Sequence, residues 1–273
     1  MILKCAFASF AAFALLACAE SETSRSKWIQ DDSIVGGIEL SAQDDAARYV
    51  VMIYDQDSKK ICTGTLIAPQ LVLTAAHCVG GRQDGLTLAF GVDPMSGKYV
   101  SRKSIAFKAH DLFNSTTNYN DLAIIYFAGN APQGYMPVLV APPSFPVKAT
   151  YPFSAIGYGR YSGLPAASEK DGQGSGRLRS TDLNIGKLSK DEKNFVVAQN
   201  AGRGICSGDS GGPALMRWRD RDYVIGVASA VIWSSKGQNK DQKNRDVCAD
   251  RSMYMNIARY GTWIRETSQN LLK

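Results

Sequence analysis

Long apolar runs, histidine and closely spaced cysteines are what this sequence has little of. After the first twenty residues, no stretch approaches the roughly 20 uninterrupted apolar residues that a membrane-spanning helix needs. The 273 residues include only two histidines and six cysteines. No two cysteines have the Cys-x-x-Cys spacing of a zinc knuckle, and no acidic cluster has calcium-loop spacing. We therefore expect no metal, no cofactor and no transmembrane helix.

The sequence does have the mixed composition of a globular protein. It is 45% hydrophobic and 21% charged, with 25 glycines, which excludes a fibrous or a disordered chain. Its net charge is +6, and it becomes +7 without residues 1–33, which hold three basic and four acidic residues. The basic residues are scattered, with the densest groups at 217–221 and 236–245. A solvated face is expected there, and no nucleic-acid partner.

The N-terminal segment is typical of an export signal. A weakly basic start, an apolar run and the small residues around Cys18 predict a signal peptide over residues 1–19, followed by a polar linker or propeptide over 20–33. Residues 15–18 (LLAC) also fit a lipoprotein signal, in which Cys18 would be acylated. We expect an exported protein, either secreted or in the periplasm or cell envelope, and a membrane partner only if Cys18 anchors it.

The rest of the chain, residues 34–273, is predicted to be one mostly β domain. Short β-branched or aromatic runs separated by Gly, Asn, Asp and Pro are typical of an all-β sandwich or barrel. These runs are 49–54, 71–74, 86–90, 123–127, 153–156, 195–198 and 223–227. Residues 162–176 are predicted to form a surface loop. Spaced apolar residues over 257–272 predict a C-terminal amphipathic helix.

Four cysteines remain outside the leader: Cys62, Cys78, Cys206 and Cys248. An even number suits two disulfides in an oxidising compartment. Their spacing leaves all three pairings open.

Three short motifs supply the parts of a nucleophilic hydrolase. Ser210 lies in residues 208–213 (GDSGGP), where glycines allow a tight turn and the amides of Gly208 and Ser210 are suited to bind an oxyanion. His77 ends residues 73–77 (LTAAH) and is the candidate base, since the other histidine, His110, begins a polar turn and is expected to be structural. Asp121 opens the apolar run 121–125 (DLAII), where a buried carboxylate would need a partner such as an imidazole N–H.

Together these strings resemble the chymotrypsin/trypsin family. They are residues 34–37 (IVGG), 74–78 (TAAHC), 121–124 (DLAI) and 208–213 (GDSGGP), in the His, Asp, Ser chain order of that family. The resemblance implies two six-stranded antiparallel β-barrels with a C-terminal α-helix, and a serine endopeptidase acting on protein or peptide substrates. It also implies the disulfides Cys62–Cys78 and Cys206–Cys248.

The resemblance further implies activation by cleavage. The α-ammonium of Ile34, once released by an activating protease, would pair with Asp209 and shape the oxyanion hole. Ser33 precedes the cleaved bond where a trypsin-like activator would need Lys or Arg.

Substrate preference is predicted to differ from that of trypsin. Gly204 stands six residues before Ser210, where relatives that cut after Lys or Arg carry Asp. Ser229 would hydrogen-bond Asp121, and Val231 would narrow the pocket. We expect small or medium apolar residues before the cut bond. Two alternatives are a catalytically silent binding or regulatory protein with this fold, and an esterase, against which the chain order of the motifs argues.

Overall fold

The structure is a computed structural model that describes residues 34–164, 174–199, 201–232 and 246–273. By its contacts the chain divides into two units, residues 1–30 and 31–273, and the described residues belong to the second. The predicted signal peptide and linker therefore lie outside the described residues. In the described part, no helix has the length and apolarity to cross a membrane.

The N-terminal half of the described chain is a closed six-stranded barrel with the order β2-β3-β4-β7-β6-β5, all neighbours antiparallel. Its strands are β2 (Val50–Asp55), β3 (Ile61–Ala68), β4 (Leu71–Thr74), β5 (Leu86–Asp93), β6 (Lys98–Ala109) and β7 (Ala123–Phe127). The core of this half consists of buried Val, Ile, Leu and Phe side chains, which fill a small barrel and leave no channel.

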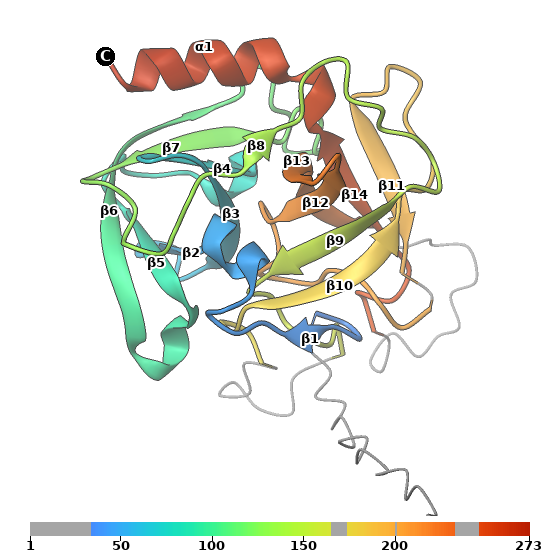
Figure 1. Ribbon diagram of the computed structural model, residues 1–273, viewed down its shortest axis with the longest axis horizontal. Helices are drawn as coiled ribbons and strands as arrows, with labels where there is room; N and C mark the ends of the chain where they lie inside the picture. The colour runs from blue at the N-terminus through green and yellow to red at the C-terminus, as the bar shows by residue number, and fades with distance from the viewer. Residues whose placement is uncertain (1–33, 165–173, 200, 233–245) are drawn as a thin grey trace, which may run out of the picture. The chain divides into compact units, whose positions relative to one another are not determined.

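The C-terminal half is an eight-stranded sheet with the order β1-β10-β9-β12-β13-β14-β11, and β8 pairs with β13 in parallel (Figure 1). Its strands are β1 (Ile38–Glu39), β8 (Leu139–Val140), β9 (Pro152–Gly157), β10 (Arg179–Asn184), β11 (Asn194–Ala198), β12 (Pro213–Trp218), β13 (Arg221–Ile232) and β14 (Arg251–Asn256). The chain after β10 turns onto β11: Gly186 N–H donates to Val196 O at 3.0 Å, and Val196 N–H to Lys187 O at 2.9 Å. These bonds join the segment after β10 to β11, which stands at the other end of the sheet order. The named strands of this half form a sheet and not a closed barrel, where a second six-stranded barrel was expected.

Helix α1 (Gly261–Leu271) ends the domain, as predicted, and lies against β6 and β7 of the barrel (Figure 1). Ile264 and Thr267 are its buried residues. The observed helix starts later than the predicted range of 257–272, because residues 257–259 form a separate turn of 3₁₀ helix. Among the described residues, the 3₁₀ helices are η1 (Asp45–Tyr49), η2 (Ala76–Cys78), η3 (Pro94–Ser96) and η5 (Ile257–Arg259).

Both expected disulfides, Cys62–Cys78 and Cys206–Cys248, are present. The first joins β3 of the barrel to η2, and the second lies within the C-terminal half. Each bond therefore closes a loop inside one half. The all-β fold with its C-terminal helix is confirmed.

Candidate active site

His77 lies on η2, directly after the buried strand β4. The short 3₁₀ turn is closed by the Cys78 N–H, which donates to Ala75 O at 3.2 Å, and the side chain of Cys78 is tied to β3 by its disulfide. The backbone around the histidine is thereby fixed on two sides. The His77 ring itself remains accessible, with 34% of its side chain exposed.

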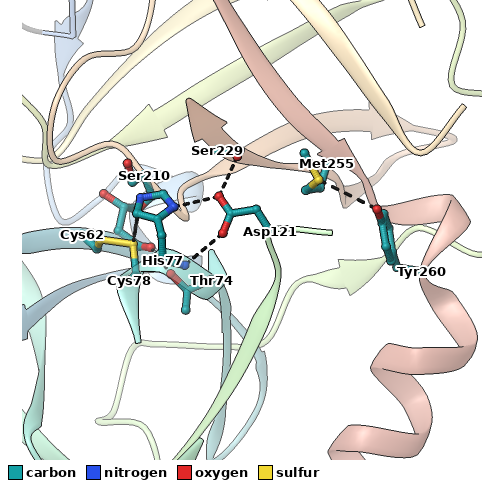
Figure 2. Close-up of polar contacts among 10 residues, drawn as sticks. Cys62, Thr74, His77, Cys78, Asp121, Ser210, Ser229, Met255 and Tyr260 are labelled. Carbon is teal, nitrogen blue, oxygen red and sulfur yellow. Dashed lines mark hydrogen bonds and ion pairs between the residues drawn. A yellow bond between two sulfur atoms is a disulfide. The ribbon is translucent and has the colours of Figure 1, made fainter. Parts of the chain in front are cut away.

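Asp121 is fully buried and is held by three donors (Figure 2). Its Oδ1 accepts the backbone N–H of His77 at 3.0 Å, and its Oδ2 lies 2.7 Å from His77 Nδ1 and accepts the Ser229 hydroxyl at 2.6 Å. A carboxylate in this position fixes the imidazole tautomer that has its proton on Nδ1, which leaves Nε2 free to accept a proton.

Two local features aim these side chains at each other. Asn120, just before Asp121, has a left-handed backbone (φ 53°), and its Oδ1 accepts the Tyr260 hydroxyl at 3.1 Å. Asn tolerates this conformation better than most residues. On the opposite side, the β13–β14 register shifts between Ala228 and Ala230, so Ser229 sits at a bulge. Bulges re-aim side chains, and here the hydroxyl points at the carboxylate.

Ser210 lies in a glycine-rich turn next to the His77 ring, near the edge that does not face Asp121 (Figure 2). Gly208 and Gly211 have φ of 102° and 83°, and a Cβ on Gly211 would lie 2.0 Å from Thr74 Oγ1. Only glycine fits there. No hydrogen bond joins Ser210 Oγ to His77 Nε2 in the described structure; such bonds are often long before substrate binds. The Gly208 and Ser210 N–H groups also have no acceptor among the described residues.

Thr63 on β3 connects the two halves of the domain at this turn. Its N–H donates to Ser210 O at 2.8 Å, its hydroxyl donates to Gly208 O at 2.9 Å, and the same oxygen accepts the Tyr158 N–H at 3.1 Å. The side chain is fully buried. A single barrel residue therefore holds both Gly208 and Ser210, the two residues whose N–H groups are expected to form the oxyanion hole.

Asp209 points away from the cleft into the interior. Its oxygens accept the N–H groups of Gly159 and Cys206, each at 2.8 Å. Burial raises its pKa to about 7, against the effect of those two N–H groups and of Arg179. Ile34 is also completely buried, in the uncut chain, and no hydrogen bond joins it to Asp209 in the described structure.

Gly204, the expected base of the substrate pocket, lies against Gln199. A Cβ on Gly204 would be 2.2 Å from the Gln199 side-chain amide carbon. That amide is completely buried. Its Nε2 donates to Ile205 O at 3.0 Å, and its Oε1 accepts the Ile205 N–H at 2.8 Å. A neutral amide thus occupies the space beside Gly204. Val231, half-buried, pairs with Ser252 of β14.

A cleft of about 590 Å³ opens at the candidate site. His77, Gly208 and Ser210 line it, together with the Cys62–Cys78 disulfide. Its remaining walls come from the β2–β3 hairpin, from residues after β9 and before β10, and from one residue each near η2 and the Ser210 turn. These lining residues are Ile53, Asp55, Ser58, Lys59, Lys60, Ile61, Gly80, Arg160, Ser175 and Ser207.

The second histidine lies apart from this group. The His110 ring packs against Trp263 and Tyr260 of the C-terminal segment, with centroids 5.0 and 5.6 Å away, and its burial lowers its pKa. This matches the structural role expected for it. Cys62, Cys78 and His77 lie close enough to resemble a metal site, but the two sulfurs are joined to each other and carry no thiolate for a metal.

This fold and these motifs define the class of protein: the chain belongs to the trypsin family, whose family model matches residues 34–264. Among curated relatives, bovine (Bos taurus) coagulation factor XII is 26% identical over 88% of this chain and 40% of its own length. Brachyurin from Leptuca pugilator is 29% identical over 66% of this chain and 80% of its own. Glucanase inhibitor protein 4 from Phytophthora infestans is 30% identical over 63% and 70%. The chain thus spans about two fifths of the factor XII that it matches.

Sequence reasoning missed Thr63, Gln199 and the cations of the cleft. Thr63 directly follows a half-cystine in residues 62–64 (CTG), and its polar side chain beside an apolar strand was the available signal. Gln199 and the cations Lys59, Lys60 and Arg160 carry no motif, so only the fold reveals their position.

Proposed function

We propose that this chain is a serine endopeptidase with Ser210 as nucleophile, His77 as general base and Asp121 as the residue that orients it. The observation that carries the proposal is the hydrogen-bonded series from Ser229 through Asp121 to His77, which meets Ser210 in one open cleft. Trypsin-family membership supports the same reading, because such sites perform acyl transfer.

In the proposed mechanism, Ser210 Oγ attacks the carbonyl carbon of the substrate while His77 Nε2 takes the hydroxyl proton. The N–H groups of Gly208 and Ser210 stabilise the negative oxygen of the tetrahedral intermediate. His77 then gives its proton to the departing amine, and the substrate's acyl part stays on Ser210 as an ester. A water molecule, activated by the same imidazole, attacks this ester and restores the serine.

We further propose that residues 1–19 are a signal peptide, that 20–33 are a propeptide or linker, and that cleavage before Ile34 activates the enzyme. Asp209 supports the last point, because it is a buried carboxyl group without a cationic hydrogen-bond partner in the described structure. A new ammonium at Ile34 would supply one. Two disulfides support export, since they persist in oxidising compartments. Acylation at Cys18 and simple signal cleavage remain two alternatives.

The proposed preference is for small or medium apolar residues before the cut bond. Gly204 brings no carboxylate to the pocket, and the buried amide of Gln199 fills the space beside it. A lysine or arginine side chain placed there would lack the ionic partner that a buried charge requires.

The test is hydrolysis of a mixed peptide library by protein that begins at Ile34, with the Ser210→Ala protein as control. Cut positions are read by mass spectrometry. We expect cleavage after Ala, Val or Leu and none in the control. Cleavage that survives the Ser210→Ala change would come from a contaminant, and an absence of cleavage together with no labelling by a serine-directed phosphonate would contradict the proposal.

A catalytically silent regulator is the second candidate. The observation in its favour is the relative named glucanase inhibitor protein 4, whose name describes an inhibitor in a chain that is 30% identical to this one. If this chain worked similarly, it would bind a protein partner without cleaving it. The phosphonate experiment separates the two candidates, because only an activated serine is labelled.

A further inference from the structure

The cleft beside Ser210 has an excess of positive charge on both of its walls. Lys59 and Lys60, on the β2–β3 hairpin, lie on the barrel side, and Arg160, which follows β9, lies on the opposite side. All three are exposed. Asp55 is the one carboxylate among the residues that line the cleft, so basic residues outnumber acidic ones by three to one.

Asp55 offsets only part of this charge: against the effect of burial, the Ser58 hydroxyl, two backbone N–H groups and Lys60 together lower the pKa of its carboxyl group. Asp55 is already engaged, because its oxygens accept the Ser58 hydroxyl at 2.6 Å and the Asp57 N–H at 2.9 Å. Lys59, Lys60 and Arg160 form no ion pair with any described residue, although many other basic residues of the domain do. Arg160 is held in place by its backbone, whose N–H donates to Ser207 O at 2.9 Å.

The position of His77 fixes which part of a substrate enters this cleft. During hydrolysis the acyl part stays on Ser210, and the amine part leaves after it takes a proton from His77. The leaving part must therefore lie on the His77 side of the serine. The cleft runs past His77 and the Cys62–Cys78 disulfide to Lys59 and Lys60, and its lining includes neither Gly204 nor Val231. It is separate from the pocket for the residue before the cut bond.

We propose that this cleft is a binding site for an acidic side chain of the substrate, placed within the first three residues after the cut bond. The site would select peptides and proteins with Asp or Glu there. The inference rests on the proposed function for its orientation, and it adds a substrate class to it. A carboxylate between Lys60 and Arg160 would meet cations from both walls without needing a deep pocket.

The size of the effect follows from the exposure of the cations. An exposed ion pair changes an equilibrium by about two- to fivefold, and a carboxylate near several cations by about tenfold. Because the cleft is open, salt should reduce the preference, most strongly when the Debye length falls well below 10 Å.

The experiment uses protein that begins at Ile34 and peptides with Ala before the cut bond. At each of the three following positions the peptides carry Glu, Gln or Lys. We expect kcat/KM to be about tenfold higher for the best Glu peptide than for its Gln counterpart, and lower still for Lys. In Lys59→Gln/Lys60→Gln and Arg160→Gln proteins the Glu preference should fall by about two- to fivefold, and in 1 M salt it should nearly vanish.

The matched controls are Lys148→Gln and Arg219→Gln, which remove exposed cations that do not line the cleft. They should keep the Glu preference. A reduction equal to that in the cleft variants would show a general effect of net charge and would overturn the proposal.

Binding separates this inference from the proposed function. The affinity of Ser210→Ala protein for the same fluorescently labelled peptides is measured by anisotropy. Equal affinity for Glu and Gln peptides overturns the acidic site, whether or not the Ser210 protein cleaves them. Tighter binding of Glu peptides that is lost in the cleft variants supports the site, even if the Ser210 protein proves inactive and the endopeptidase proposal fails.

Discussion

Thr63 makes three hydrogen bonds to residues of the C-terminal half, two through its hydroxyl and one through its backbone N–H. Its hydroxyl donates to Gly208 O and accepts from Tyr158 N–H, while its backbone N–H donates to Ser210 O. An unpaired buried polar group costs about 1–3 kcal/mol, so the hydroxyl does more than fill space. By holding the Gly208 carbonyl, it restricts the orientation of the neighbouring peptide units that are proposed to bind the oxyanion. We therefore regard Thr63 as a positioning residue.

Replacing Thr63 by Val tests this role, because Val keeps the shape and removes the hydroxyl. We expect kcat to fall by about 10- to 100-fold, with KM changed by less than about threefold, since the oxyanion contact strengthens in the transition state. Steady-state kinetics on one peptide substrate provide the measurement. Thr63→Ser restores the hydroxyl and should recover most of kcat. A Val variant that folds and retains full kcat would remove Thr63 from the catalytic apparatus.

At the scale of the element, strands were predictable where burial on both faces produced an apolar run. The runs at 71–74 and 123–127 match β4 and β7 residue for residue. The long strand β6 was not singled out, because most of its side chains are exposed and its sequence is rich in Lys, Arg and Ser. It is a strand because it pairs with β5 and β7. A local sequence pattern does not show which segments will pair, so this strand could not be predicted from it.

The same limit applies to the candidate site. Ser210, His77 and Asp121 stand in motifs whose glycines and apolar neighbours are local, so they could be identified from the sequence. The contact from Thr63 to Gly208 spans 145 residues, and its chemistry depends on how two halves meet. The packing of Gln199 beside Gly204 could not be predicted either, because it depends on a loop conformation that the composition does not specify.

The Cys62–Cys78 bond joins β3 to the 3₁₀ turn η2, which carries His77. The bond closes a loop with a sequence separation of 16. In the chain-entropy treatment, replacing both cysteines by Ala should lower the free energy of unfolding by roughly 3 kcal/mol. Guanidinium unfolding of the Ser210→Ala protein, with and without the disulfide, measures the difference while excluding self-digestion. Replacing Cys206 and Cys248 gives the comparison, with an expected loss of roughly 4 kcal/mol for the longer loop.

At the scale of the whole molecule, the stability of the uncut chain should depend on Asp209. Its pKa is about 7 in the folded protein, against an ordinary value of 3.8. The folded state therefore binds one more proton than the unfolded state between these two values, and stability falls as pH rises from about 4 to about 7. Below about pH 4 the protonated Asp209 therefore adds its full stabilisation to the folded state, and above about pH 7 that stabilisation is lost.

Asp209→Asn should remove this pH dependence, because an amide does not titrate. The check is a series of urea unfolding curves from pH 4 to pH 8 on the uncut Ser210→Ala chain with and without the Asn change. The difference between the two proteins should grow steadily toward pH 7 and then stay level. A difference that is constant with pH would mean that Asp209 is already ionised in the uncut chain.

The two halves hold different parts of the proposed active site: His77 and Asp121 belong to the barrel half, and Ser210 and Ser229 to the half with the later sheet. Synthesis proceeds from the N-terminus, so the base is in the chain long before the nucleophile. A ribosome that stalls anywhere before Ser210 releases a fragment that has no attacking hydroxyl at this site. Incomplete translation products of the proposed enzyme therefore lack its proposed nucleophile.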